Sequence, residues 1–301
     1  MTFSFNDIPD LTGQVAIITG ANSGIGLVTA RQLALHNCHV ILACRSAERA
    51  VPVVNALAAE ISATAGKVEF MALDMMSLAS IRAFVAAFIA KNLPLHMLIN
   101  NAGIYAVPFR LSVDGIEAQF ATNHVGVMAL TLGLLPLLEA ARVAKIVCVS
   151  SAVHQMAPKM GINFDHINDE NVYNKNTAYG QSKLATILFA RELHKRLRAR
   201  GVNHVYVNAL HPGVVRTDIF RELPWIVQQL LWLFQRSVDD GAKTQLYCAA
   251  SPEIEKNGVS GEYFTAIAKL KKTTTLGQDM ALAAKLWTFT EELIAAKTPI
   301  H

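Results

Sequence analysis

The chain has 301 residues, of which 52% are apolar and 17% are charged. This composition argues against a disordered chain and allows a single α/β domain with a large buried core. The net charge at pH 7 is only +4, and no group of lysines and arginines is dense enough to follow a phosphate backbone, which excludes a dedicated nucleic-acid-binding protein.

Short β-branched runs alternate with longer helical stretches along the whole chain. In chain order, strands are predicted at 15–19, 40–43, 68–73, 97–100, 145–150, 205–209 and 263–265. Helices are predicted near 24–36, 46–64, 78–91, 112–141, 179–200, 240–250 and 279–296. Uniformly apolar strands separated by helices predict a parallel sheet covered on both faces, which is a doubly wound Rossmann fold of three layers in one α/β domain over 1–301.

Cysteine use and the apolar runs bear on the cellular compartment. Four cysteines occur, none of them in a CxxC pair: Cys38, Cys44, Cys148 and Cys248. They indicate reduced thiols of an intracellular protein. Residues 1–11 are not typical of a signal peptide, and the apolar runs 127–138 and 223–234 are too short or too broken to span a bilayer. We therefore expect a cytoplasmic protein, with peripheral contact with a membrane left open.

A glycine-rich turn follows the first predicted strand. Its sequence, from Thr19 to Gly26, is TGANSGIG, and a predicted helix begins within it. Gly20 permits a tight turn, Gly24 lets the backbone approach a pyrophosphate, and Gly26 lets the helix pack closely on the strand. The helix then points its free N–H groups and the positive end of its dipole at the phosphates. Strand, turn and helix together predict a dinucleotide site.

The TGxxxGIG spacing resembles that of the short-chain dehydrogenase/reductase family, and the resemblance extends over nearly the whole chain. Further motifs follow in family order: Asp74, the run NNAG, Asn123, the pair Ser150-Ser151, Tyr179-x-x-x-Lys183 and Pro212-Gly213. Within the family, the phrases HVILACR, NHVG and HPGVV are similar to the retinol dehydrogenase and WW-domain-containing oxidoreductase group. The resemblance implies an NAD(P)-dependent oxidoreductase that acts on CH–OH and C=O groups.

The end of the second strand bears on the choice between NAD and NADP. An NAD enzyme usually has an acidic residue there, which binds the ribose 2′-hydroxyl. In this chain the position, about 18–20 residues beyond the glycine turn, is the neutral Cys44, followed by Arg45 and Ser46. A guanidinium can pair with a 2′-phosphate in a bidentate manner, so the sequence favours NADP(H) over NAD(H). The alternative is that Arg45 only begins a surface helix.

Tyr179 and Lys183 lie four residues apart on a predicted helix, so both project from one face. A phenol normally titrates near pH ~10, and we expect the neighbouring ammonium to stabilise the phenolate and lower that pKa. Tyr179 is then the acid/base that exchanges a proton with the substrate oxygen. The resemblance implies that Lys183 also binds the nicotinamide ribose. Tyr173 has Thr177, not a lysine, four residues on, and is a poor catalytic candidate.

The resemblance implies roles for further residues. Ser151 would polarise the substrate oxygen, with Ser150 as the alternative. Asn123 would bend its helix and hold a water near the lysine, unless it is only a satisfied polar side chain of the core. Asp74 would lie near the adenine, unless it caps the helix that begins near Ser77. The expected cofactor contacts are Gly20, Asn22, Ser23, Gly24, Ile25, Gly26, Arg45, Ser46, Asp74, Asn101, Ala102, Gly103, Tyr179, Lys183, Pro212, Gly213, Val215 and Thr217.

The substrate is expected to be lipophilic. Residues 218–236 are rich in Ile, Leu, Phe and Trp, and in the family this region forms a small helical substrate lid, expected here at about 215–240. An apolar lid suits a retinoid-like or steroid-like aldehyde, ketone or alcohol. The alternatives are a helix buried against its own core and an amphipathic patch that rests on a membrane. Residues 154–178 resemble the longer loop of the retinol dehydrogenase group.

Two long predicted helices, 112–141 and 179–200, carry more apolar residues than one face of a sheet requires. Examples are Leu184, Ile187, Leu188 and Phe189. Family members often dimerise through this pair of helices, and an exposed apolar face would favour a homodimer. A monomer is the alternative.

Metal chemistry is not expected, because the ten histidines show no ligand spacing such as HExxH. Two other functions stay open beside the enzyme: an NADP(H)-bound regulator of a protein partner, and a membrane-surface scaffold. The intact set of Tyr179, Lys183, Ser151 and Asn123 argues against the regulator, because a sensor of cofactor binding does not need it.

Overall fold

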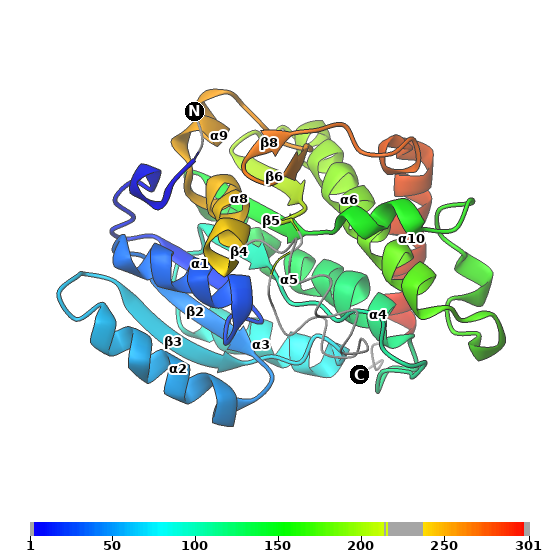
Figure 1. Cartoon of the computed structure of the whole chain (residues 1–301), viewed down its shortest axis with the longest axis horizontal. Coiled ribbons are helices and arrows are strands. Elements are labelled where there is room, and N and C mark those ends of the chain that lie inside the picture. The colour runs from blue at the N-terminus through cyan, green and yellow to red at the C-terminus, as the bar shows by residue number, and fades with distance from the viewer. Residues whose placement is uncertain (1–2, 214, 216–236, 298–301) are drawn as a thin grey trace.

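The computed structural model describes residues 3–213, 215 and 237–297, and Figure 1 shows their arrangement. The expected lid segment 218–236 lies outside these residues. The first half contains η1 (Phe5–Asp7), β1 (Val15–Thr19), α1 (Gly24–Leu35), β2 (His39–Cys44), α2 (Ala47–Glu60), β3 (Lys67–Ala72), α3 (Leu78–Ala90), β4 (Met97–Asn100), α4 (Ala118–Phe120), the π-helical turn η2 (Ala121–Val125) and α5 (Gly126–Ala140). The second half contains β5 (Ala144–Val149), η3 (Ala152–Met156), η4 (Phe164–His166), η5 (Glu170–Val172), α6 (Lys175–Ala199), β6 (Val205–Leu210), α8 (Val238–Ala250), α9 (Pro252–Lys256), β7 (Tyr263–Thr265), β8 (Lys269–Leu270), η7 (Leu276–Gln278) and α10 (Met280–Ala296).

The strands form one sheet in the order β3-β2-β1-β4-β5-β6-β7-β8. All neighbours from β3 to β7 pair in parallel, and only β8 runs antiparallel, with Leu270 opposite Phe264. After β3 the chain crosses back to place β4 on the other side of β1, so the order of strands reverses between β1 and β4. In doubly wound sheets a ligand binds at this point, outside the carboxyl ends of the strands.

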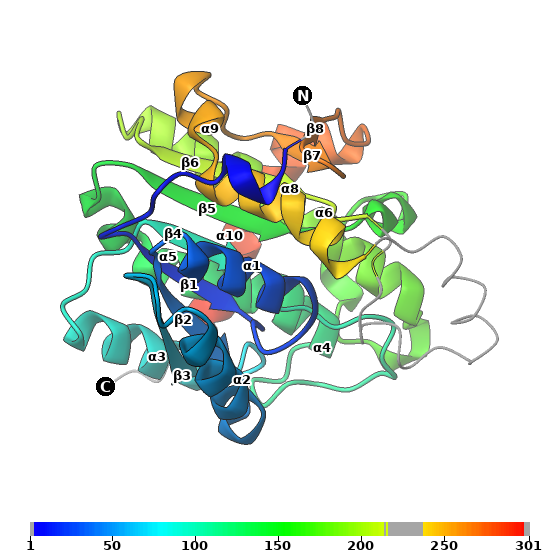
Figure 2. The ribbon, with the colours of Figure 1, turned by 60° about the vertical axis from the view of Figure 1, so that its left-hand side comes forward.

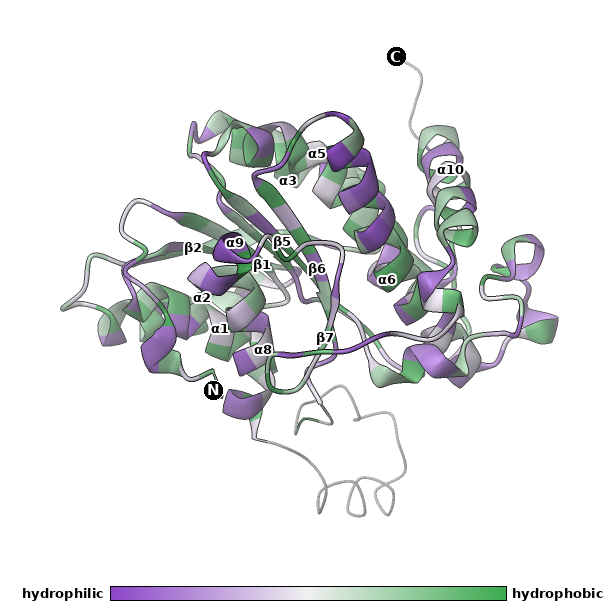
Figure 3. Ribbon diagram, turned by 90° about the horizontal axis from the view of Figure 1, so that it is seen from above, coloured by the Kyte–Doolittle hydropathy of each residue, from purple (hydrophilic) through white to green (hydrophobic). Residues whose placement is uncertain are grey.

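Helices cover both faces of the sheet, as Figures 2 and 3 show from two directions, with α1 and α8 on one face and α3 and α5 on the other. Alternation along β1 divides the core between the faces, because successive side chains of a strand point to opposite sides. Val15 and Ile17 belong to the cluster that α3, α5, α6 and α10 bury, whereas Ala16 and Ile18 belong to the cluster under α1 and α8. The predicted three-layer Rossmann fold is confirmed.

Two helices begin well away from their predicted starts. The helix predicted at 112–141 begins at Ala118, because Gly115 has a left-handed φ of +71° and the Glu117 carboxylate accepts two backbone N–H bonds of the first turn. The helix predicted at 179–200 begins at Lys175, because the Asn174 side chain caps it in the same way. Tyr179 therefore lies within the second turn of α6 and not at its start.

Two long apolar helices are explained by the core of the protein itself. By length and composition, the stretch Ala118–Ala140 could cross a membrane, but 67% of its most apolar window is buried. On α6, the side chains taken above as a dimer face are all buried, because α10 packs along this helix and Trp287 stacks on Phe189 at 5.8 Å. The argument for a homodimer from this face is therefore wrong, because the face provides no exposed surface. Its residues are Leu184, Ile187, Leu188 and Phe189.

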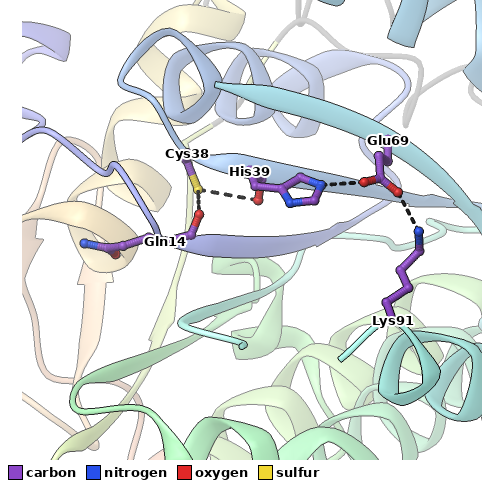
Figure 4. A network of polar contacts seen from close by, with 5 residues as sticks. All are labelled: Gln14, Cys38, His39, Glu69 and Lys91. Atoms are coloured by element: carbon purple, nitrogen blue, oxygen red, sulfur yellow. Dashed lines mark hydrogen bonds and ion pairs between the residues drawn. The ribbon is translucent and has the colours of Figure 1, made fainter. Parts of the chain in front are cut away.

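Polar contacts connect β2 and β3 at their amino ends, opposite the edge of the sheet where ligands bind (Figure 4). His39 at the start of β2 contacts the carboxylate of Glu69 on β3 at 2.7 Å, and Lys91, which follows α3, donates to the same carboxylate at 2.7 Å. The Lys91 ammonium lowers the pKa of Glu69. The Cys38 thiol donates to the Gln14 carbonyl at 3.4 Å. These contacts fix the amino ends of β2 and β3, away from the edge where ligands bind.

Candidate active site

The glycine turn after β1 is held in shape by the segment after β4. Gly20 has a left-handed φ of +65°, and a Cβ at Gly26 would lie 2.5 Å from the side-chain nitrogen of Asn101. That nitrogen donates to the carbonyl oxygens of Thr19 at 2.8 Å and Gly20 at 3.2 Å. The Thr19 hydroxyl in turn accepts the backbone N–H groups of Asn101 and Ala102 at 3.0 and 2.9 Å. The two strand ends therefore form one rigid unit at the reversal point of the sheet.

The start of α1 has free hydrogen-bond donors. Ser23 occupies the N-cap position, yet its side chain makes no hydrogen bond with the first turn of the helix. The backbone N–H groups there can bind an anion, and Gly24 has a left-handed φ of +56° that brings the backbone close to it. Ile25 and Val215 both border Gly241: a Cβ added at Gly241 would lie 2.8 Å from the side chain of Ile25 and 2.6 Å from that of Val215. The glycine cradle fits the pyrophosphate of a dinucleotide.

The end of β2 lies against this turn. The Cys44 thiol is buried and close to the backbone N–H groups of Gly20, Ala21 and Asn22, while burial raises its pKa. Cys44 is therefore neutral at pH 7. Arg45 follows it and is exposed.

Ser46 and Asp74 both have local structural partners. Ser46 is the N-cap of α2, and its hydroxyl accepts the N–H of Arg49 at 3.3 Å. Asp74 accepts the N–H of Met76 at 2.9 Å, and the cap of α3 is Ser77. The alternative that Asp74 caps this helix is therefore wrong, and its carboxylate is partly exposed at the same edge of the sheet.

Tyr179 and Lys183 lie on one face of α6 and are buried to 5% and 3% exposure. The Lys183 ammonium is 5.6 Å from the centre of the Tyr179 ring and donates to the Val149 carbonyl at 2.9 Å. Burial lowers the pKa of Lys183 to about 8. Burial also raises the pKa of Tyr179, whereas contact with the Ser151 hydroxyl lowers it. The pKa of Tyr179 is therefore raised, opposite to the expected direction, because desolvation of the phenol outweighs the contact with Ser151.

The two serines after β5 differ in their surroundings. Ser150 is buried, and its hydroxyl donates to the Lys183 carbonyl at 2.7 Å, so its hydrogen is committed to α6. Ser151 is half-buried and accepts the N–H of Val153 at 3.2 Å, so its own O–H can donate elsewhere. Of the two serines, Ser151 is therefore the one whose hydroxyl hydrogen is available to a further partner. Gly180 lets the η3 turn that follows Ser151 pack backbone against backbone on α6.

Asn123 lies in the π-helical turn η2 between α4 and α5. Its side chain pairs with both backbone groups of Ile104 at 3.0 Å and donates to the Ser182 hydroxyl at 2.9 Å. A Cβ at Gly103 would lie 3.1 Å from the Asn123 side-chain oxygen and 3.2 Å from the Lys183 ammonium. Asn123 therefore fixes the segment after β4 against α6 beside the lysine. The Asn123 carbonyl accepts the Thr186 hydroxyl at 3.0 Å.

The segment after β6 brings further expected residues to this edge. Gly213 has a left-handed φ of +97° and follows Pro212, and both are partly exposed. Thr217 and the lid segment lie outside the described residues. His124, near Asn123 in the sequence, is buried and contacts the Thr290 hydroxyl at 2.9 Å, so it belongs to the core. Within the described part of the chain, no group of three His, Cys, Asp or Glu side chains could hold a metal ion.

Four residues of this site were not assigned a role from the sequence. Thr19 and Ser182 hold the backbone, Gly180 allows the approach of η3, and Tyr105 packs edge-on against Tyr179 with ring centres 4.6 Å apart. Thr19 lies within the TGxxxGIG motif and Gly180 lies between Tyr179 and Lys183, so the sequence motifs already pointed to both residues. The contacts of Tyr105 and Ser182 depend on the tertiary fold.

Comparison with known proteins agrees with this geometry. A family model described as short chain dehydrogenase matches residues 14–225. Human retinol dehydrogenase 14 is 40% identical over 299 residues, which cover 94% of this chain and 86% of that protein. Human WW domain-containing oxidoreductase is 40% identical over 293 residues, which cover 95% of this chain and 69% of that protein. A crystal structure of an uncharacterized protein from Mycobacterium paratuberculosis has a TM-score of 0.78 and 32% identity, and the match covers 100% of both chains. The chain therefore belongs to the short-chain dehydrogenase/reductase family of oxidoreductases.

Proposed function

We propose that this protein is an NADP(H)-dependent oxidoreductase that interconverts a lipophilic carbonyl compound and its alcohol, with Tyr179 as the acid/base. The observation that carries the proposal is the setting of the Tyr179 phenol. It is buried next to the Ser151 hydroxyl and the Lys183 ammonium, at the edge of the sheet where the glycine turn lies. Family members use NAD(P)(H), and the cradle formed by Gly20, Gly24 and the start of α1 fits that cofactor.

Tyr179, Ser151 and Lys183 have separate roles in the reduction of a carbonyl group. The chemistry that NADP(H) supplies when bound is hydride transfer at its nicotinamide ring. Because burial raises the pKa of Tyr179, the phenol is protonated at pH 7 and can give its proton to the carbonyl oxygen as negative charge develops there. Ser151 donates a hydrogen bond to the same oxygen. Lys183, with a pKa of about 8, is mostly charged at pH 7 and stabilises the phenolate that remains.

The preference for NADP(H) is proposed from the end of β2. The Cys44 thiol is neutral and does not repel a 2′-phosphate, and Arg45 is exposed beside it. Arg49, on the first turn of α2, is close enough to lower the pKa of Cys44, which puts a second guanidinium near the same point. Arg45→Ala should raise the KM for NADPH far more than the KM for NADH. Equal effects on both cofactors would contradict the phosphate contact, and Arg82→Ala on α3 serves as the control.

A lipophilic substrate is proposed from two features. One is the apolar composition of residues 218–236, and the other is the similarity to retinol dehydrogenase 14, whose name identifies a lipophilic alcohol. A cytoplasmic location, peripheral contact with a membrane and a homodimer stay predictions.

The test is NADPH oxidation across a panel of lipophilic aldehydes and ketones. Tyr179→Phe should lose nearly all turnover on a good substrate, because it removes the hydroxyl that carries the transferable proton. It should keep most of its affinity for NADPH, because the other expected cofactor contacts remain. Tyr247→Phe on α8 is the matched control and should keep the wild-type rate. Full activity of Tyr179→Phe would end the catalytic proposal. NADPH binding without turnover of any substrate would instead favour the regulatory alternative.

A further inference from the structure

A cavity of about 360 Å³ lies beside Ser151 at the carboxyl edge of the sheet. Its walls come from η3, from the segment after β6 at Gly213, and from β7 with the residues that follow β8. Ala152, the neighbour of Ser151 in the chain, lines it. The cavity therefore opens next to the group that we propose to hold the substrate oxygen.

The lining of this cavity is polar and basic. Lys271 and Lys272 both line it, together with Gln155, Thr265, Thr273 and Thr274, and none of its described lining residues is an aspartate or a glutamate. Both lysines are exposed, and neither forms an ion pair with a described carboxylate. Two ammonium groups and the Thr274 hydroxyl line one space without a negative partner from the part of the chain that the structure describes. The hydroxyl hydrogens of Thr265 and Thr273 are used by the Lys269 carbonyl and by His154. This arrangement matches the oxygen atoms of an anion.

The basic wall is tied to Ser151 through one buried ring. His154 contacts the Ser151 carbonyl through Nδ1 at 2.7 Å and the Thr273 hydroxyl through Nε2 at 3.2 Å. The ring also packs edge-on against Tyr263 of β7, with centres 5.3 Å apart. Burial and the nearby Lys271 charge both lower the pKa of His154, so the ring is neutral at pH 7. His154 therefore holds the segment that carries Lys271 and Lys272 at a constant distance from Ser151.

We infer that this cavity binds an anionic group of the substrate, a carboxylate or a phosphate, at a fixed distance from the carbonyl or alcohol carbon that reacts. The inference rests on the proposed function and narrows its substrate class from any lipophilic carbonyl compound to amphipathic ones. The volume exceeds that of one carboxylate, so the cavity also holds part of the chain that joins the two groups. Lysines suit this role because each ammonium is a compact charge on a flexible side chain, which can reach the oxygen atoms of a carboxylate or of a phosphate.

The test compares ten-carbon aldehydes that differ only at the far end: a terminal carboxylate, its methyl ester, and a terminal phosphate. The wild-type protein should show a kcat/KM for one of the two anions at least roughly tenfold above that for the ester, about the effect of one charged hydrogen bond. The Lys271→Ala/Lys272→Ala variant should lose that preference and keep its rate on the ester. The Lys67→Ala/Lys256→Ala variant removes the same charge from distant exposed sites and should behave as wild type.

A binding measurement separates this inference from the proposed function. Calorimetry with decanoate, or with decyl phosphate, should give a Kd roughly tenfold weaker in the Lys271→Ala/Lys272→Ala variant than in the wild type, in the presence of NADP. Turnover of the ester without any preference for an anion would overturn the anion site and leave the oxidoreductase intact. A lysine-dependent Kd without turnover of any aldehyde would leave the anion site intact and refute the oxidoreductase. Equal losses in both double variants would also overturn the site, because they would reflect net charge alone.

Discussion

Gly180 lies where the η3 turn touches α6, directly after Tyr179. A Cβ at this position would lie 2.8 Å from both the Met156 carbonyl carbon and the Val153 carbonyl oxygen, and 2.9 Å from the Ala157 nitrogen. All three are backbone atoms, which cannot turn aside as a side chain can. Since ordinary contact begins near 3.4 Å, Gly180→Ala is expected to push η3 and α6 apart by about 0.6 Å.

The displacement should affect stability less than catalysis. Overpacking costs about 1–3 kcal/mol, and replacing a helical glycine by alanine returns about 1 kcal/mol, so the free energy of unfolding should fall by about 0–2 kcal/mol. The same movement shifts Ser151 relative to Tyr179. Because a misplacement of about 1 Å can cost about 10²-fold in rate, kcat/KM should fall by roughly ten- to a hundredfold.

Urea denaturation and NADPH oxidation measure the two effects separately. Gly133→Ala on α5 is a matched control, because the three atoms nearest to its added Cβ all belong to the Val85 side chain, from 2.9 Å outward, and none to the backbone around the site. This control should keep the wild-type kcat/KM. A Gly180→Ala protein with unchanged kcat/KM would refute the reasoning, and so would an equal loss in Gly133→Ala.

Three further predictions follow from buried or paired groups. Lys183 has a pKa of about 8 in the folded protein, against an ordinary value of 10.5. The unfolded state therefore binds more protons between these two values, and stability rises with pH there. Lys183→Met should therefore be inactive yet more stable than wild type at pH 7 in urea denaturation, with an advantage that shrinks toward pH 10; a constant difference would contradict this. Thr19→Val removes the acceptor of two backbone N–H groups and should cost about 1–3 kcal/mol in urea denaturation, whereas Thr19→Ser should cost little. Glu69 has a pKa lowered by Lys91, so its contribution is present above its unfolded pKa and is lost as pH falls through the folded value. Because the Glu69 side chain is 37% exposed, Glu69→Gln should cost under about 1 kcal/mol at pH 7, and thermal melts of variant and wild type should converge at low pH.

The strands could be predicted because a buried parallel strand is a continuous apolar run. The bounds of β1, β4 and β7 are those predicted from the sequence. β8 could not be predicted, because two exposed residues, Lys269 and Leu270, carry no apolar pattern. The starts of α4 and α6 depend on side-chain caps at Glu117 and Asn174, which apolar periodicity does not report.

The candidate site could be predicted where its residues are close in sequence. The glycine turn and the Tyr179–Lys183 pair are local spacings, and the fold brings both to the same edge of the sheet. The bond from Asn101 to Thr19 spans 82 residues and has no local signature. The direction of the Tyr179 pKa was wrong for a related reason: desolvation depends on how completely neighbouring elements enclose the phenol, and only the folded structure contains that information.

The open sheet has two outer strands, β3 and β8, whose outward N–H and C=O groups could pair with a strand of another molecule. Each of these strands begins with an exposed lysine, Lys67 on β3 and Lys269 on β8. Joining two sheets side by side would require each ammonium to shed its hydration without gaining a partner. The two lysines should therefore disfavour edge-to-edge pairing between two copies of the chain.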